Sequence, residues 1–267
     1  MPSLFETPYI IELLTPKQSD EDVEARLETF AERYLRILDA GAAVSIPDNP
    51  MGNVHYNAIE VIDFMDLPVD SEGTLLHLNS FHTKSDLDSF LHIAASRGVK
   101  NLLVVSGDGS PRLPRLEPSD VGIDAKTVTS VVLLQYIERE YTGVFKCGVA
   151  FNQFEPPDRE LQRLARKIDA GARFVITQPV IGEDTVVVSL SDFGLPVFIG
   201  AWMSRRVELL LECVGVEPNV DMKYDPFENL AQLHQIYPEY GLYLALLSFK
   251  LDWSEFLARE VPWTPGT

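Results

Sequence analysis

Cysteine is nearly absent from this sequence. The 267 residues contain only two, Cys147 and Cys213. Neither belongs to a C-x-x-C motif or to a cluster of cysteines and histidines, so the sequence offers neither a disulfide framework nor the ligand spacing of a zinc site. Both thiols lie in segments that are largely apolar, and we expect each to be a buried free cysteine.

Positive charge is also in short supply. Lysine and arginine together number 22 against 40 aspartates and glutamates, which gives a formal net charge of −18. A surface of this sign repels phosphate backbones and anionic membranes, so we expect neither a nucleic-acid nor a membrane partner. The simplest role for the excess carboxylates is solubility.

Targeting signals and long apolar runs are missing as well. The N-terminal segment M-P-S-L-F-E-T-P-Y has neither the basic start nor the apolar run of a signal peptide. No stretch approaches the roughly 18 apolar residues that span a bilayer, and we expect a cytoplasmic protein. The glycine signatures G-x-G-x-x-G and G-x-x-x-x-G-K-[ST] do not occur, which removes the usual support for a Rossmann or P-loop fold.

What the sequence does contain is an alternation of short β-rich apolar runs with longer amphipathic stretches. The expected strands cover residues 9–14, 42–46, 74–79, 101–106, 145–152, 173–178, 196–201 and 242–249, of which the last fits a helix equally well. The expected helices cover residues 19–38, 85–98, 125–140, 158–170, 205–213 and 253–259, with Ser85 as the N-cap of the second and Gly98 at its end.

This alternation indicates βαβ units and a parallel sheet. About eight such units in one chain of this length predict the α/β class and a single (β/α)8 TIM-type barrel over residues 1–267. The irregular stretch 47–73 and the loop 107–122 both follow expected strands. Both should therefore lie at the end of the barrel where such folds keep their chemistry.

Four segments, in chain order, resemble the methylenetetrahydrofolate reductase family. E-L-L-T-P from Glu12 is similar to the family's E-F-F-P-P, and H-L-N-S-F-H-T-K-S-D-L from His77 is similar to its H-L-T-C-x-D-x-T-x-x-E-L. L-L-V-V-S-G-D, which ends at Asp108, is similar to I-x-A-L-R-G-D. The most specific match is K-I-D-A-G-A-R-F-V-I-T-Q, from Lys167 to Gln178.

The resemblance implies a flavin enzyme that acts on a tetrahydrofolate-type small molecule. In this family FAD takes a hydride from NADH or NADPH and passes it to the methylene carbon of 5,10-methylenetetrahydrofolate. Opening the folate's five-membered ring requires an acid that protonates a nitrogen while the carbon becomes an electrophilic iminium. Glu12 matches the family's general acid, and its apolar strand should desolvate the carboxylate and raise its pKa. The alternative is a strand carboxylate paired with a basic neighbour.

The resemblance assigns roles to five further residues. Asp108 matches a catalytic aspartate near the flavin and the folate ring, and Gln178 would offer a donor and an acceptor to the pterin edge. Glu160 and Lys167 share one helix face and match residues at the flavin phosphate or ribitol. His77 matches a cofactor-side histidine at the end of the third strand. The alternatives are a loop-capping role for Asp108 and a hydrogen-bonded amide at the barrel mouth for Gln178. For Glu160 and Lys167 the alternative is a solvated helix surface, and for His77 it is a packing role.

Some positions depart from the family pattern. Ser106 replaces the arginine before G-D, the eighth strand lacks its terminal arginine, and residues 47–57 show no recognisable pyrophosphate-binding sequence. The loop F-N-Q-F-E-P-P-D lacks the family's histidine. Cationic groups make charge-assisted contacts to phosphates, so the loss of these arginines weakens the expected contacts to FAD. Three interpretations therefore stay open. They are a reductase that uses FAD, a non-catalytic folate-binding or partner subunit on the same barrel, and a flavin-independent reductase. A homo-oligomer or an assembly with a partner subunit is the corresponding expectation for quaternary structure.

Overall fold

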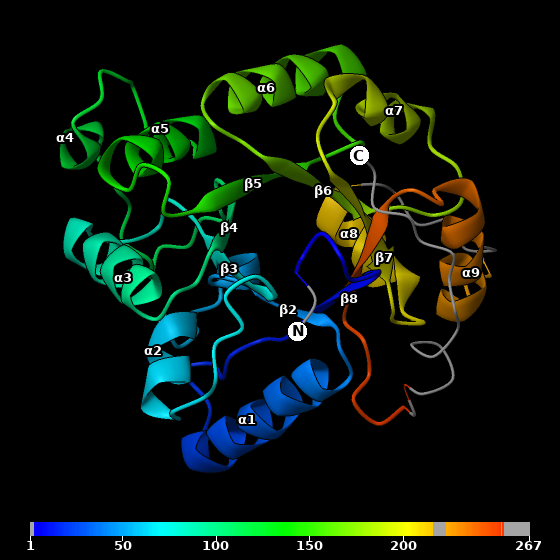
Figure 1. Cartoon of the computed structure of the whole chain (residues 1–267), viewed down its shortest axis with the longest axis horizontal. Coiled ribbons are helices and arrows are strands. Elements are labelled where there is room, and N and C mark those ends of the chain that lie inside the picture. The colour runs from blue at the N-terminus through cyan, green and yellow to red at the C-terminus, as the bar shows by residue number, and fades with distance from the viewer. Residues whose placement is uncertain (1–2, 216–222, 252, 254–267) are drawn as a thin grey trace.

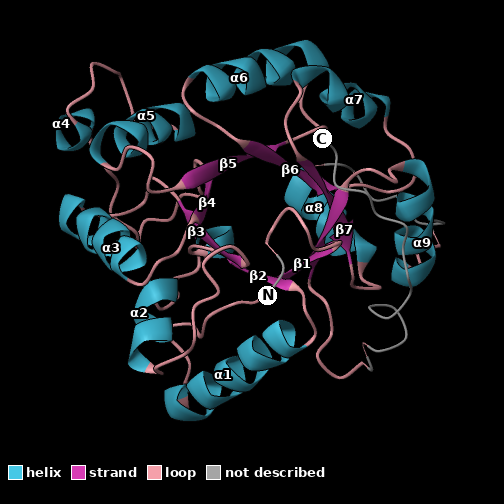
Figure 2. Ribbon diagram, viewed as in Figure 1, coloured by secondary structure: helices cyan, strands magenta, loops and turns pink. Residues whose placement is uncertain are grey.

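The structure, a computed structural model, describes residues 3–215, 223–251 and 253. Its centre is a closed barrel in which each strand pairs in parallel with the next and β1 pairs with β8 (Figure 2). The strands are β1 (Tyr9–Glu12), β2 (Ala43–Ile46), β3 (Thr74–Leu78), β4 (Asn101–Val104), β5 (Lys146–Phe151), β6 (Phe174–Pro179), β7 (Val197–Trp202) and β8 (Gly241–Ala245). The predicted (β/α)8 barrel is confirmed, and residues 241–245 form a strand rather than a helix.

Helices other than α8 surround the barrel on its outside, whereas α8 (Val207–Val214) is seen within the ring of strands in this view (Figure 1) and its Leu210 belongs to the same apolar cluster as the barrel interior. The other helices are α1 (Val23–Asp39), α2 (Ala58–Phe64), α3 (Lys84–Ser96), α4 (Pro118–Val121), α5 (Ser130–Glu140), α6 (Pro157–Asp169), α7 (Thr185–Val188) and α9 (Pro226–Ile236), with short 3-10 turns η1 (Pro50–Gly52) and η2 (Ser189–Phe193). Among the helices so described, none combines the length and the apolar character that crossing a bilayer requires.

Capping residues explain where the helices differ from the predictions. The N-cap of α3 lies two residues earlier than expected, because Thr83 rather than Ser85 caps the helix and forms a capping box with Asp86. Helix α5 begins at Ser130, since Thr129 caps it, so residues 125–129 lie outside the helix.

Four of the described helices were not predicted: the one-turn helices α4 and α7, and the longer α2 and α9. Helix α2 lies within the stretch 47–73 that was expected to be irregular, and the Asn57 side chain caps it. Helix α9 follows Asp225, which accepts from two backbone N–H groups, and carries Pro226 in its first turn. The expected closing helix over 253–259 falls, apart from Trp253, outside the described residues.

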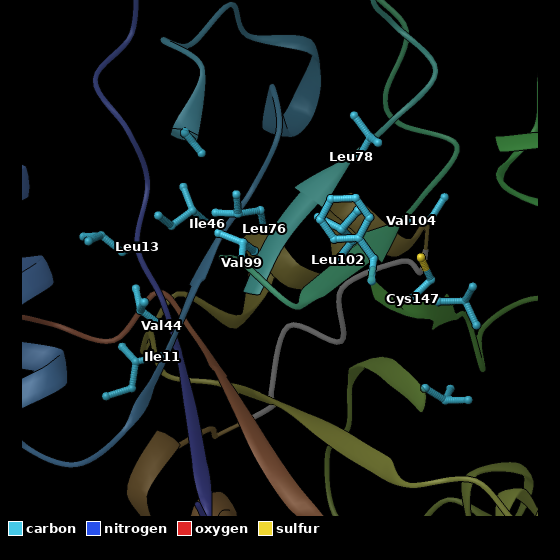
Figure 3. Close-up of a cluster of buried hydrophobic side chains, with 14 of the residues drawn as sticks. Ile11, Leu13, Val44, Ile46, Leu76, Leu78, Val99, Leu102, Val104 and Cys147 are labelled. Carbon is cyan, nitrogen blue, oxygen red and sulfur yellow. The ribbon is translucent and has the colours of Figure 1, made fainter. Parts of the chain in front are cut away.

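Each strand buries both of its faces, and alternation divides the apolar residues into two layers. One layer lies between the strands and the helices; Figure 3 shows part of it, with Ile11, Val44, Leu76 and Cys147 among its labelled side chains. Cys147 is thus the buried thiol expected from the sequence, whereas the side chain of Cys213 lies outside the described part of the chain.

The second layer fills the interior of the barrel. Its members include Ile10, Ala43, Leu75, Leu103, Phe174, Ile176, Phe198 and Tyr243. The rings of Phe174 and Phe198 meet edge to face with their centroids 5.9 Å apart. A Cβ on Gly148 of β5 would lie 2.0 Å from the Phe174 ring, so the phenylalanine occupies the space that a larger residue on β5 would need. The interior is therefore a packed core, and chemistry is left to its rim.

Candidate functional site

Alternation along the first three strands places polar residues at one end of the barrel interior. Ile10, Ala43 and Leu75 belong to the interior layer. The residues two positions later are Glu12, Ser45 and His77, which must face the same way. Glu12 lies directly opposite Ser45 in the register of β1 and β2. Three apolar strands thus end in an acid, a hydroxyl and an imidazole at the carboxyl end of the barrel.

Glu12 receives a hydrogen bond from the far end of the chain. The hydroxyl of Tyr243 on β8 donates to Oε2 of Glu12 over 2.9 Å. Burial raises the pKa of Glu12, and the hydrogen bonds from Tyr243 and from the backbone of Leu246 oppose that rise without cancelling it. Burial likewise raises the pKa of Tyr243 far above its ordinary value, and the Glu12 carboxylate adds to this. At neutral pH the phenol is therefore a donor, while the carboxyl keeps a larger protonated fraction than an exposed glutamate would.

His77 is held in its neutral form. Its Nε2 lies 2.8 Å from Oγ of Ser45, and its ring centroid lies 6.3 Å from that of Tyr243. Burial lowers the pKa of His77 to about 4, although the charge of Asp48 works in the opposite direction. A neutral imidazole has one N–H donor and one acceptor nitrogen, so His77 can pass hydrogen bonds on in both directions.

A cavity of about 270 Å³ adjoins His77. The loop after β2 supplies Asp48 to its wall, and the segment after β3 supplies His82. Oδ2 of Asp48 lies 2.6 Å from Nε2 of His82 and also accepts from the backbone N–H of Asn79. Burial by itself lowers the pKa of His82, but the hydrogen bond and charge of Asp48, with the charge of Asp86, outweigh it and raise that pKa. The cavity thus has a buried acid–imidazole pair in its wall.

Asp108 does not join Glu12. Its side chain is exposed, and its Oδ2 accepts from the backbone N–H of Met51 over 2.8 Å. A Cβ on Gly52 would lie 3.1 Å from the carbonyl oxygen of Gly109, so the loop after β2 packs closely against the loop after β4. Asp108 connects these two loops, and its catalytic or cofactor role stays a prediction.

Gln178 sits at an irregularity between β6 and β7. The register shifts between Ile176 and Pro179, and the backbone N–H of Gly200 donates to Oγ1 of Thr177 over 2.9 Å. The side-chain amide of Gln153 donates to the carbonyls of Gln178 and Pro179, which fixes the irregular segment from the β5 side. Bulges of this kind re-aim a side chain at a strand end. The position of the half-buried Gln178 side chain therefore depends on contacts from Gln153, after β5, and from Gly200 on β7.

Glu160 and Lys167 form a buried pair on α6. Nζ of Lys167 lies 2.6 Å from the carbonyl oxygen of Ala150 on β5 and 3.5 Å from Oε1 of Glu160. Arg163 reaches the other carboxylate oxygen over 3.1 Å. The face that carries Glu160 and Lys167 is not solvated, because it ties α6 to the end of β5. Their assignment to a flavin stays a prediction.

Sequence reasoning missed Ser45, Tyr243, Asp48 and the pairing of His82. Period-two alternation in A-A-V-S-I could have placed Ser45 on the face of Glu12, but only once both strands were assigned and paired. The Tyr243 contact had no local signal, because the residue is 231 positions from Glu12. In the described part of the chain, no group of three or more His, Cys, Asp and Glu side chains is arranged to hold a metal ion.

Comparison with known proteins agrees with this architecture. Residues 6–188, more than half of the chain, match the sequence profile of the family described as methylenetetrahydrofolate reductase. A Caenorhabditis elegans protein named probable methylenetetrahydrofolate reductase (NADPH) is 24% identical over 219 residues, which cover 78% of this chain and 30% of that protein. The chain thus spans less than a third of this relative's length.

Two solved structures share the fold. An uncharacterized protein from Clostridium thermocellum, which binds two copies of 5-methyl-5,6,7,8-tetrahydrofolic acid, superposes with a TM-score of 0.61 at 11% identity over 95% of this chain and 94% of its own. A dihydropteroate synthetase with bound product gives 0.50 at 12% identity over 90% and 88%. At these identities both bear on the fold alone. The match of the family profile over most of the barrel decides the assignment, and the chain belongs to the methylenetetrahydrofolate reductase family.

Proposed function

We propose that this chain reduces a tetrahydrofolate-type substrate, 5,10-methylenetetrahydrofolate in the first instance, with NADH or NADPH as the source of the hydride. Membership of the family supports the reaction class. The tetrahydrofolate ligand of the Clostridium thermocellum protein supports the substrate class. The observation that carries the proposal is the partly buried Glu12 carboxyl, whose pKa is raised at the end of the barrel where such folds keep their chemistry.

Glu12 supplies the proton that the reaction requires. Cleavage of the bond between the methylene carbon and a folate nitrogen leaves an electron pair on that nitrogen, and an acid must provide a proton there. An ordinary glutamate is ionised at neutral pH, whereas a raised pKa keeps a useful fraction of Glu12 protonated. The hydrogen bond from Tyr243 then stabilises the carboxylate that remains after the proton has left. Gln178, at the same end of the barrel, offers amide groups of both polarities for the pterin edge.

The described residues do not fit the diphosphate of a tightly held FAD. Lys167, the lysine assigned to it by resemblance, already binds the Ala150 carbonyl and Glu160. Arg112 lines the cavity beside His77, but so do three carboxylates, Asp48, Glu60 and Asp86. A diphosphate requires cations or backbone N–H groups directed at it. This charge pattern favours the flavin-independent form of the reaction, in which a dinucleotide donor enters and leaves with its diphosphate in solvent.

An activity assay with two arms tests the proposal. The purified chain is given 5,10-methylenetetrahydrofolate with NADH or NADPH, with and without added FAD, and formation of the methyl product is followed. Turnover without FAD and without a flavin spectrum selects direct hydride transfer; turnover only with FAD restores the flavin enzyme. Tight binding of folate with no turnover in either arm would establish the non-catalytic alternative and refute the proposal.

Glu12→Gln tests the acid directly. The amide keeps the shape of the side chain but cannot donate an acidic proton, so turnover should fall by about 100-fold or more while the folate still binds. Glu24→Gln is the matched control, because Glu24 is an exposed glutamate in the first turn of α1. Equal activity of Glu12→Gln and Glu24→Gln would exclude Glu12 as the acid.

A further inference from the structure

A second and larger cavity lies at the amino end of the barrel. Its volume is about 740 Å³, against about 270 Å³ for the cavity beside His77. Several of the residues that line it precede or begin strands: Lys100 before β4, Lys146 at the start of β5, Arg173 before β6 and Pro196 before β7. The candidate catalytic residues are not among the described residues in its wall. A ligand of this cavity would therefore be distinct from the substrate of the proposed reaction, whose site is at the carboxyl end.

The strand side of this cavity carries three cations on neighbouring strands. Strands β4, β5 and β6 follow one another around the barrel. The backbone N–H of Lys146 donates to the Lys100 carbonyl, and that of Arg173 donates to the Cys147 carbonyl, each over 2.7 Å. Lys100, Lys146 and Arg173 thus form a row along the amino ends of these strands. The chain as a whole has a formal net charge of −18, so this row is a local reversal of its sign.

The middle cation of the row already has its partners, whereas the outer two do not. Nζ of Lys146 lies 2.9 Å from Oε2 of Glu72 and 5.5 Å from the centroid of the Phe5 ring. Lys100 and Arg173 form neither an ion pair nor a side-chain hydrogen bond with any residue that the structure describes. Carboxylates outnumber lysines and arginines by 40 to 22 in this chain. Two cations left unpaired in one cavity wall are therefore available to an anionic group of a ligand.

The helix side of the cavity is negative. Glu138, near the end of α5, lines the cavity, and within the described part of the chain its carboxylate has no ion pair and no hydrogen bond. It lies close to the segment that carries Arg173, since a Cβ on Gly171 would be 2.6 Å from Cγ of Glu138. Helix α5 ends at Glu140 and residues 142–144 continue the wall, so the negative end of the helix adds to the charge of Glu138. The cavity thus offers free charges of both signs.

The rest of the lining is largely apolar and is held by the barrel core. Phe5, Phe145 and Pro196 contribute to it. The half-buried Phe5 ring meets Phe174 edge to face with centroids 5.6 Å apart and lies 5.9 Å from Phe198. Both of these rings belong to the interior layer. An apolar group that enters the cavity therefore finds a preformed surface on which to pack.

We propose that this cavity binds an α-amino acid with an apolar side chain. The carboxylate binds Arg173, whose planar guanidinium matches it, and Lys100 adds a second positive charge. The ammonium binds Glu138, and the side chain packs on Phe5. A simple anion or a simple cation would leave one of the free charges unpaired, whereas a zwitterion engages both. The site is a binding site at the opposite end of the barrel from Glu12, and it does not depend on the proposed reductase activity.

Calorimetric titration of the full chain with three small molecules tests the charge pattern. L-Phenylalanine is the probe, 3-phenylpropionate lacks its ammonium and 2-phenylethylamine lacks its carboxylate. Each analogue should bind about tenfold more weakly than L-phenylalanine, because each loses one charge-assisted contact. Equal affinity for L-phenylalanine and 3-phenylpropionate, or no binding at about 10 mM L-phenylalanine, would overturn the proposal.

Two substitutions place the ligand in the cavity. Arg173→Met should weaken L-phenylalanine about tenfold and leave 2-phenylethylamine unchanged, and Lys100→Met should act in the same direction. Glu138→Gln should weaken L-phenylalanine and remove its advantage over 3-phenylpropionate. Arg159→Met is the matched control, because Arg159 is an exposed arginine on α6 outside the cavity. Equal affinities in Arg173→Met and Arg159→Met would exclude this cavity as the site.

Two further measurements separate this site from other occupants and from the proposed function. Displacement of L-phenylalanine by folate would place the probe at the carboxyl end and overturn the proposal. A dimer in sedimentation that dissociates in Arg173→Met would assign the cavity to a second copy of the chain, with the same consequence. A chain that shows the expected pattern of variants, with unchanged affinity in Glu12→Gln, but reduces no folate would support this site and refute the proposed function alone.

Discussion

Substitution of Gly200 by alanine should disturb the carboxyl end of β6, where Gln178 is proposed to bind folate, without touching any candidate catalytic side chain. A Cβ at Gly200 would lie 2.8 Å from the carbonyl carbon of Gln178, the nitrogen of Pro179 and the carbonyl oxygen of Thr177. All three are backbone atoms of the irregular segment that aims Gln178. No rotamer change can relieve such a contact, so β6 and β7 must move apart locally.

The magnitude follows from two opposing effects. Overpacking in a well-packed interior costs about 1–3 kcal/mol. Gly200 lies outside the positive-φ glycines, so alanine recovers about 0.4–1 kcal/mol from the lower entropy of the unfolded chain. The net loss should be about 1–2 kcal/mol, which lowers Tm by roughly 2–8 °C for a domain of this size. Folate affinity should fall by a few-fold, because Gln178 moves with the backbone.

Thermal and urea unfolding measure the first effect, and folate titration measures the second. Gly109→Ala is the control: Gly109 also lies outside the positive-φ set, and the nearest atom to its Cβ would be the edge of the Phe81 ring at 3.2 Å. That ring can give way, so the control should unfold within about 0.5 kcal/mol of the wild type. A Gly200→Ala variant with the wild-type Tm and folate affinity would refute the close approach of β7 to the β6 bulge.

Three further predictions concern buried charge. Burial raises the pKa of Glu12, so the stability linked to its protonation is present below the pKa of the unfolded chain and is lost as pH rises through the pKa of the folded chain. Glu12→Gln should therefore unfold at a higher urea concentration than the wild type at about pH 8 but not at about pH 4. An equal gain in stability at both pH values would contradict the raised pKa. Lys167→Met should cost about 1–3 kcal/mol in a thermal melt without flavin, since Glu160 keeps Arg163 but loses its second cation, and an effect on flavin binding alone would contradict this structural role. Asp48 raises the pKa of His82, so Asp48→Asn should lower the stability of the chain by about 2 kcal/mol below about pH 6.5. The difference from the wild type should vanish as pH rises through the pKa of His82 in the folded chain. Thermal melts that show the same loss at every pH would exclude this linkage.

The sequence by itself determined the barrel. Its apolar runs recur with helical stretches between them, and burial of each run on both faces leaves a closed parallel sheet as the arrangement that satisfies them all. It also determined that Glu12 would lie at the carboxyl end, because a polar residue that ends an apolar strand can escape the core only at the rim. The caps of α2 and α9 were readable as well, but Asn57 was assigned to an irregular stretch and Asp225 was given no role.

The tertiary structure decided what surrounds Glu12. Tyr243, Ser45 and His77 come from β8, β2 and β3, and they meet only when β8 closes on β1. Local sequence patterns report which face of an element is apolar, but not which polar groups from other elements will satisfy one another there. The same limit applies to Lys167: its spacing with Glu160 placed both on one face of α6, whereas packing against β5 decided that this face is buried. Burial then removed the water that would have kept these groups at their ordinary pKa values, and so turned a pattern of residue types into a site with defined proton affinities.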